Sequence, residues 1–191
     1  GRYKIKKKLG QGRSSVFLCS DQDKENKELA IKILSKDADK EERFTFQKEF
    51  ITLHRFEHPN IITVNNFGTI VKKENDEDIE IGSKYFTLEH FNGSNLLDYE
   101  DLNNENELSK IITQLCSAIY YFHQSNYIYY DLKPENILIK KIDNEPIIKL
   151  IDFGFIQNVN DNNEKSIRGT AEYIAPELLK NTPHDNRVDL Y

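Results

Sequence analysis

Residues 131–136 read Asp-Leu-Lys-Pro-Glu-Asn and place three groups that suit phosphate chemistry on one short loop. Asp131 could accept a proton from a hydroxyl, Lys133 could neutralise a phosphate, and the amide oxygen of Asn136 could bind a metal ion. Asp152, in the stretch Ile-Asp-Phe-Gly, adds a second carboxylate. Such hard oxygen ligands suit Mg²⁺, which takes few protein ligands together with substrate phosphates. Taken alone, Asp152 fits a plain Asp–Gly turn better.

A glycine-rich stretch at residues 9–17 could bind phosphate through its backbone. Gly10 and Gly12 follow the first predicted strand, and glycine lets the backbone turn tightly and its amides approach an anion closely. By itself, a pair of glycines more often marks a hairpin turn. A dinucleotide-binding fingerprint is excluded because a strand, and not a helix, is predicted to follow.

Lys32 lies inside the apolar strand Leu-Ala-Ile-Lys. A lysine in a strand is more often an outward-facing surface group, because side chains alternate between the two faces. The functional interpretation needs an acidic partner, and Glu49 on the next predicted helix supplies one. An ion pair between them could hold the lysine over the phosphates of a nucleotide.

The first part of the chain must position these groups with strands and one helix. The first 35 residues predict a three-stranded antiparallel meander. A helix follows, with Phe46, Phe50, Leu53 and Phe56 on one face, and Pro59 with the next residue is expected to end it. Two more strands are predicted over 61–71 and 83–91, on either side of a charged, solvated loop.

The second part begins with a strong helix over residues 106–126. Its predicted apolar stripe consists of Leu108, Ile111, Ile112, Leu115, Ile119 and Phe122. A hairpin over 136–151 and a polar loop over 157–166 come next. These elements predict an α+β fold of two lobes. The N-terminal lobe is expected over 1–88, the join over 89–95 and a mainly helical C-terminal lobe over 96–191.

Composition excludes several classes of protein. The formal net charge of −6 argues against a nucleic-acid binder, which would show a basic face. No apolar run reaches the ~18 residues that a transmembrane helix needs. Two cysteines far apart in the sequence do not form a disulfide framework and fit a reducing compartment, so a cytoplasmic location is expected. Nothing in the composition predicts the oligomeric state.

Taken together, these motifs closely resemble the eukaryotic-type protein kinase family over nearly the whole chain. The resemblance rests on their order: the glycine-rich hairpin, the strand lysine, the helix glutamate, DLKPEN, DFG and GTAEYIAPE. It implies a bilobal kinase-like fold with ATP and Mg²⁺ as cofactors. The nucleotide-binding residues that it implies are Gly10, Gly12, Ser15, Phe17, Ala30, Lys32, Glu49, Glu89, Phe91, Asn95 and Leu138.

Several of these positions have specific implied roles. Ser15 stands where the family has a third glycine, and Phe17 where it has the valine that packs on adenine. Ala30 would complete the ceiling of the adenine site and Leu138 its floor. The hinge, residues 89–91, would bind adenine through its backbone, and Asn95 stands where many kinases place an acidic residue on the ribose.

The resemblance also assigns the chemistry. Asp131 would be the catalytic base, Lys133 would neutralise the γ-phosphoryl, and Asn136 and Asp152 would hold Mg²⁺. Thr170 would form hydrogen bonds near Asp131 and Lys133. DLKPEN and GTAEYIAPE resemble the serine/threonine class, which implies serine and threonine hydroxyls of proteins as substrates.

Two tyrosines depart from the family pattern. Tyr129 replaces a histidine that packs under Phe153 of DFG, a change seen in other kinases. Tyr130 replaces an arginine that receives the activation-loop phosphate through charge-assisted hydrogen bonds. Tyrosine carries no charge, so phosphorylation of Ser166 is not expected to be the main switch.

The resemblance stops within the long central helix of the C-terminal lobe, where Asp189 would brace the catalytic loop. We therefore expect a truncated catalytic domain, cut from a longer protein, that exposes apolar surface. The motifs leave two other functions to compare: a pseudokinase that acts as a scaffold and a kinase of small molecules. The retained lysine, glutamate, aspartates and asparagine argue against the first, and GTAEYIAPE, a peptide-docking segment in the family, argues against the second.

Overall fold

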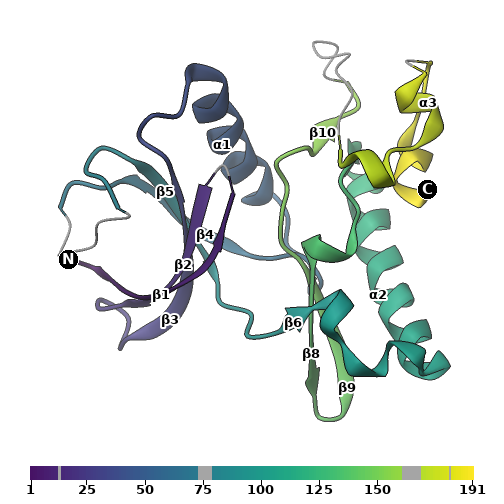
Figure 1. The fold of residues 1–191 in the computed structure, drawn as a ribbon, viewed down its shortest axis with the longest axis horizontal. Coiled ribbons are helices and arrows are strands. Elements are labelled where there is room, and N and C mark those ends of the chain that lie inside the picture. Colours follow the sequence, from purple (N-terminus) through teal and green to yellow (C-terminus); the bar gives the residue numbers. More distant parts are fainter. Residues whose placement is uncertain (13, 73–78, 161–168, 181) are drawn as a thin grey trace. The chain divides into compact units, whose positions relative to one another are not determined.

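The computed structural model describes residues 1–191 except 13, 73–78, 161–168 and 181 (Figure 1). The chain divides into two compact units. Unit 1 comprises residues 1–57 and 62–90, and unit 2 comprises 58–61 and 91–191. The division between residues 90 and 91 falls inside the segment predicted as the join. No helix within the described ranges is long and apolar enough to cross a membrane.

Unit 1 is built on a five-stranded antiparallel sheet with the order β1-β2-β3-β5-β4. The strands are β1 (Tyr3–Gln11), β2 (Ser14–Asp21), β3 (Lys27–Leu34), β4 (Val64–Thr69) and β5 (Lys84–Glu89). The predicted meander and both further strands are therefore confirmed. Alternate residues of β2 and β3 form an apolar cluster on one face, which includes Phe17, Cys19, Leu29, Ile31 and Ile33.

The other face of this sheet carries α1 (Lys40–Leu53). Asp39 caps the helix in a capping box with Glu42, which satisfies backbone donors at its N-terminus. The Phe46 ring packs against Phe86 of β5 at a centroid distance of 4.8 Å.

Helix α1 ends earlier than the sequence predicted. It stops at Leu53, so Phe56 lies beyond the helix although its side chain is buried. The physical reason is a tight turn, in which the backbone N–H of Phe56 donates to Leu53 O at 3.0 Å. Pro59 therefore does not set the helix end.

Residues 58–61, which include Pro59, belong to unit 2 and not to the unit that contains α1. They pack with unit 2, although the predicted N-terminal lobe of residues 1–88 includes them. The side-chain amide of Asn60 donates to Gln114 Oε1 at 2.8 Å and to Ile148 O at 3.0 Å. These bonds tie the segment to the main helix and hairpin of unit 2.

Unit 2 combines one long helix, α2 (Glu105–Gln124), with short strands and turns. The strands are β6 (Ser94–Asn95), β7 (Tyr127–Ile128), β8 (Ile137–Ile142), β9 (Glu145–Leu150) and β10 (Gln157–Asn158). The other helical elements are η1 (Leu96–Asp98), η2 (Glu100–Asn103), η3 (Pro134–Asn136), η4 (Ala171–Tyr173), α3 (Pro176–Leu179) and η5 (Asn186–Leu190). Strands β8 and β9 form the predicted hairpin, and β6 extends its sheet.

The apolar stripe of α2 is only partly buried. Ile111, Ile119 and Phe122 lie in the core, whereas Leu108 and Ile112 are 38% and 48% exposed. The buried face is narrower than the predicted stripe: α2 contacts β9, η2 and β7, while Leu108 and Ile112 stay exposed. Exposed apolar side chains of unit 2 include Leu108, Ile112, Tyr120, Leu190 and Tyr191, and those of unit 1 include Phe44 and Val71. The apolar surface expected from truncation therefore stays a prediction.

Candidate active site

Lys32 and Glu49 form an ion pair inside unit 1, with 2.6 Å between Lys32 Nζ and Glu49 Oε1. Lys32 stands opposite Phe86 in the β3–β5 ladder, so it lies on the sheet face that α1 covers. The side chains are only 14% and 5% exposed. The expected pair is thus present, and it is shielded from water by the packing of α1 on the sheet. Its part in binding phosphate stays a prediction.

The position of Phe17 corrects one expectation. Phe17 pairs with Ile31, whereas Lys32 pairs with Val16 and Ala30 pairs with Leu18. Directly opposed residues share a face, so Phe17 lies on the opposite side of the sheet from Ala30 and Lys32. Its ring is buried in the apolar cluster on that side. Val16, one residue earlier, lies beside Lys32 on the face where the resemblance implied Phe17.

The glycine-rich hairpin joins β1 and β2. Gly10 pairs with Val16 and Gln11 with Ser15, and the N–H of Gly12 donates to Ser14 O at 3.0 Å. A Cβ atom added to Gly10 or Gly12 would meet no described atom within 4 Å. Packing within the described residues therefore does not require glycine at these two positions. Close approach of a ligand to the backbone would require it.

The remaining predicted nucleotide-site residues fall in different units. Glu89 belongs to unit 1, where its carboxylate accepts a hydrogen bond from Thr63 N at 2.9 Å. Phe91, Asn95 and Leu138 belong to unit 2, and Asn95 and Leu138 are directly opposed in the β6–β8 ladder. The structure therefore brings the implied ribose and adenine-floor positions together on one face of a sheet.

Asp131 is the centre of a polar network in unit 2. The hydroxyl of Thr170 donates to Asp131 Oδ1 at 2.7 Å, and the Asn136 amide donates to Asp131 Oδ2 at 2.8 Å. Lys133 Nζ lies 3.0 Å from Asp131 Oδ2 and donates to Thr170 Oγ1 at 2.6 Å. The carboxylate is nearly fully buried, yet both of its oxygens have polar partners. The predicted contacts of Thr170 are confirmed.

Asn136 is fixed by the backbone around it. Its side-chain nitrogen also donates to Asp131 O at 2.8 Å. Its backbone carbonyl accepts a hydrogen bond from Ile151 N at 3.1 Å. That second bond joins the loop to the residue before Asp152. The carboxylate of Asp152 accepts from Gly154 N at 3.1 Å, which holds it in a tight turn.

Tyr129 contacts the backbone of Asp152 in a way that the sequence did not reveal. Its side chain is fully buried, with the ring 5.3 Å from that of Phe153 and edge-on to it, so the expected packing is confirmed. Its hydroxyl donates to Asp152 O at 2.5 Å. Burial, followed by the charges of Asp152 and Asp131, raises the pKa of Tyr129 well above its ordinary value. The hydroxyl therefore stays protonated and remains a donor.

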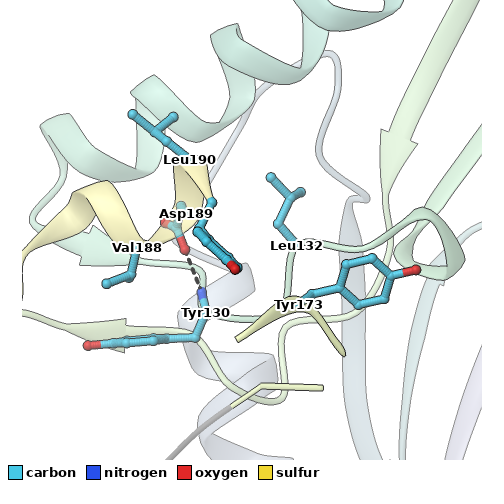
Figure 2. Close-up of a pocket in the computed structure, with 7 residues that line it drawn as sticks. Tyr130, Leu132, Tyr173, Val188, Asp189 and Leu190 are labelled. Atoms are coloured by element: carbon cyan, nitrogen blue, oxygen red, sulfur yellow. Dashed lines mark hydrogen bonds between the residues drawn. The ribbon is translucent and has the colours of Figure 1, made fainter. Parts of the chain in front are cut away.

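Asp189 braces the start of the loop, as the sequence suggested. Its buried carboxylate accepts from Tyr129 N at 2.9 Å and from Tyr130 N at 2.8 Å, and His123 Nε2 lies 2.8 Å away. Figure 2 shows the bond to Tyr130 beside a small cavity. The cavity is lined by Tyr130, Leu132, Tyr173, Val188, Asp189, Leu190 and Tyr191. A single side chain thus fixes two successive backbone amides just before Asp131.

Comparison with known proteins identifies the family. The model of the protein kinase domain matches residues 3–191. The chain belongs to the protein kinase family. Its relatives include the serine/threonine-protein kinase pkn3 of Myxococcus xanthus, 30% identical over the whole of this chain and 36% of that protein. They also include calcium-dependent protein kinase 5 of Plasmodium falciparum, 34% identical over 96% of this chain and 31% of that protein.

A third relative is the serine/threonine-protein kinase DCLK1 of Rattus norvegicus, 30% identical over the whole chain and 42% of that protein. This kinase chain therefore spans about a third to two fifths of the length of these relatives.

The kinase loop offers ligands that fit a magnesium ion. Because the Asn136 nitrogen donates twice to Asp131, its side-chain oxygen remains as the ligand atom. Asp152 supplies a carboxylate from a neighbouring turn. Within the described ranges no group of three His, Cys, Asp or Glu side chains could hold a metal. An amide oxygen and a carboxylate are the kind of sparse ligand set that Mg²⁺ completes with substrate phosphates.

One predicted regulatory residue lies outside the described part of this kinase. Ser166 falls in the segment 161–168, so its expected role stays a sequence prediction.

Proposed function

We propose that this kinase domain transfers the γ-phosphoryl group of ATP to serine and threonine hydroxyls of proteins in a Mg²⁺-dependent reaction. The observation that carries this proposal is the Asp131 network. A nearly buried carboxylate is held at both oxygens by Thr170, Lys133 and Asn136, within one loop and the segment after DFG. Lys133 also donates to Thr170 Oγ1, so a cation lies beside the carboxylate that would accept the proton.

The geometry suits a base that orients a hydroxyl. Asp131 would accept the hydroxyl proton, and the bond from Thr170 fixes the direction of its carboxylate. Lys133, 3.0 Å from that carboxylate, would neutralise charge on the transferred group. Mg²⁺ bound by Asn136 and Asp152 would supply electrostatic stabilisation of the phosphates. Catalysis would then consist of positioning and electrostatics, with no covalent intermediate on the protein.

Lys32 would hold the α- and β-phosphates, oriented by Glu49. The ion pair of 2.6 Å sets the lysine on the α1 side of the sheet and supports this role. Serine/threonine specificity rests on the DLKPEN and GTAEYIAPE segments and on the names of the relatives. We also propose a cytoplasmic location, since Cys19 and Cys116 form no disulfide and suit a reducing compartment.

The test is phosphotransfer from labelled ATP to a generic serine/threonine peptide by the complete protein with Mg²⁺. Asp131→Asn and Lys32→Met should each lower the signal about 100-fold or more. Matched controls are Asp101→Asn and Lys110→Met, which disturb exposed ion pairs of 2.7 and 2.6 Å and should leave activity unchanged. ATP binding without any phosphotransfer by the unmodified protein would instead support an ATP-binding scaffold.

A further inference from the structure

Tyr130 has an unusual backbone and close neighbours. Its φ of 68° lies in the left-handed region, which residues other than glycine seldom adopt. The bond from its N–H to Asp189 Oδ1 helps to hold it there. Gly169 has a φ of 104°, and a Cβ atom at that position would lie 2.6 Å from Tyr130 O. The backbone of Gly169 therefore packs directly on the Tyr130 carbonyl.

The side chain of Tyr130 packs into an apolar cluster of unit 2. The buried members of this cluster are Ile128, Ile174, Ala175, Leu178 and Val188. Figure 2 shows the Tyr130 ring beneath Val188. The ring also meets His184 edge-on at a centroid distance of 5.9 Å, with Tyr130 Oη 3.1 Å from His184 Nε2. One uncharged side chain thus contacts residues from both 174–178 and 184–188.

These contacts bear on Asp131 through Thr170. Thr170 lies between Gly169, which packs on the Tyr130 carbonyl, and Ile174, a member of the cluster against which Tyr130 packs. It donates its hydroxyl to Asp131 Oδ1. We propose that Tyr130 is a positioning residue that docks segments 169–178 and 184–188 onto the catalytic loop by apolar packing and a hydrogen bond. An arginine would present a charge to this apolar cluster, and charge is costly to bury there.

This inference rests on the proposed kinase activity and adds a consequence for it. Residues 169–177 are the segment expected to dock the peptide, so loosening it should weaken peptide use first. The ATP-binding residues Lys32 and Glu49 belong to unit 1. Loss of the Tyr130 contacts should therefore raise the KM for peptide and lower kcat, with little change in the KM for ATP.

The experiment compares Tyr130→Ala with Tyr120→Ala in the complete protein. Tyr120 is a 64% exposed tyrosine of α2 and serves as the matched control. Tyr130→Ala should lower kcat/KM for peptide about tenfold or more, while the KM for ATP stays within about twofold. Tyr130→Phe, which keeps the ring, should show a smaller loss, of about two- to fivefold. Equal rises of both KM values, or a Tyr130→Ala enzyme that behaves like Tyr120→Ala, would overturn the proposal.

A double-mutant cycle isolates the hydrogen bond and does not depend on a large core change. Tyr130→Phe and His184→Phe each keep an aromatic ring and lose the bond. Each should lower kcat/KM for peptide by about two- to fivefold, and the double variant should lose no more than either single one. Fully additive losses would show that the two side chains do not act together.

Hydrogen exchange separates this proposal from the kinase assignment. Tyr130→Ala should speed amide exchange in 169–178 and leave α1 unchanged. If the unmodified protein transfers no phosphoryl group, the proposed function fails, and the exchange result still decides whether Tyr130 docks this segment. Unchanged exchange in 169–178 would reject the docking role even in an active enzyme.

Discussion

The Lys32–Glu49 pair of unit 1 and the Asp131 network of unit 2 are held in place by different means. Lys32 and Glu49 project from a strand and a helix whose packing fixes the distance between them. Asp131 projects from irregular backbone, and side chains far away in the sequence hold it: Thr170 at its carboxylate, and Asp189 at the two preceding amides. Regular elements position the first site, and specific polar contacts position the second.

This difference predicts how each site fails. A site on regular elements loses mainly the function of the group that is removed. A site on irregular backbone also depends on distant residues that touch no substrate. A mutation in unit 1 should therefore affect only the function of the altered group. In unit 2, mutations at several distant residues should each displace Asp131 and lower activity.

Removal of the carboxylate itself should have the largest effect. Asp131→Asn is expected to lower kcat about 10²- to 10⁴-fold, because the amide cannot accept the hydroxyl proton. Since Lys32 and Glu49 lie in the other unit, ATP affinity should change little. Steady-state kinetics with varied ATP, combined with a binding measurement, tests both parts. A large rise in the dissociation constant for ATP would contradict the local independence of the two sites.

Loss of the Lys32–Glu49 ion pair in unit 1 should weaken the use of ATP. Glu49→Gln removes the charged partner of a mostly buried lysine, and charged hydrogen bonds of this kind contribute about 1.5–3 kcal/mol. We expect kcat/KM for ATP to fall about 10- to 100-fold, with the KM for peptide nearly unchanged. Lys6, paired with Glu28 on the exposed surface, provides the control variant Glu28→Gln. If Glu28→Gln has an equal effect, general electrostatics and not the Lys32 contact would explain the loss.

The sequence predicted unit 1 better than it predicted the contacts of unit 2. Strand alternation and helical periodicity place Lys32 and Glu49 on their elements, and packing of those elements brings them together. Register is harder to predict, because a shift by one residue reverses every side chain of a strand. The resemblance placed Phe17 at the adenine, and the register puts it on the opposite face from Ala30 and Lys32.

Contacts between segments that lie far apart in the chain are harder to predict from the sequence. The family pattern pointed to Thr170 and Asp189 as partners of the loop, and the structure confirms both. Nothing in the periodicity pointed to the bond from Tyr129 to Asp152 O. The identity of residue 129 was a possible signal, because tyrosine in place of histidine still offers a donor at the end of an aromatic ring.

The next largest effect should come from substitution of Asp189, which is distant in sequence from Asp131. Asp189→Asn exchanges one acceptor oxygen for a donor beside the amides of Tyr129 and Tyr130. A buried N–H left without a partner costs about 1–3 kcal/mol, so unfolding should become easier by that amount. Thermal melting and kcat measured on the same variant should both fall. Asp185→Asn, on an exposed side chain four residues earlier, should change neither. A stable Asp189→Asn enzyme with full activity would contradict the bracing role.

The Tyr129 hydroxyl should contribute less. Tyr129→Phe keeps the ring contacts with Phe122 and Phe153 and removes the donor to Asp152 O. Loss of one hydrogen bond should cost about 1 kcal/mol of stability. Activity should drop a few-fold, because the turn that carries Asp152 is held less firmly. Because the pKa of Tyr129 is raised, its ionisation should add no step to the pH–rate profile near neutrality. A neutral-pH step that disappears in Tyr129→Phe would contradict that assignment.

The smallest effect should come from His58, which helps tie residues 58–61 to unit 2. Its Nε2 lies 3.1 Å from Ser117 Oγ, and its Nδ1 accepts from Asn60 N at 3.1 Å, as an unprotonated nitrogen can. Partial burial, and then the charge of Lys149, lowers the pKa of His58 below its ordinary value of 6.5. The unfolded chain therefore takes up the proton at a higher pH than the folded chain does.

Stability should then fall as the pH drops below about 6.5 towards the lowered pKa of His58 in the folded state. His58→Gln removes this titration, so its melting temperature should change less than that of the unmodified protein between pH 7.5 and 5.5. Hydrogen exchange can assign the loss to a unit, since acid should loosen α2 and the 58–61 segment before α1. If α1 loosens first, the acid-sensitive contacts lie in unit 1, and this result would contradict the assignment of the loss to His58 and unit 2.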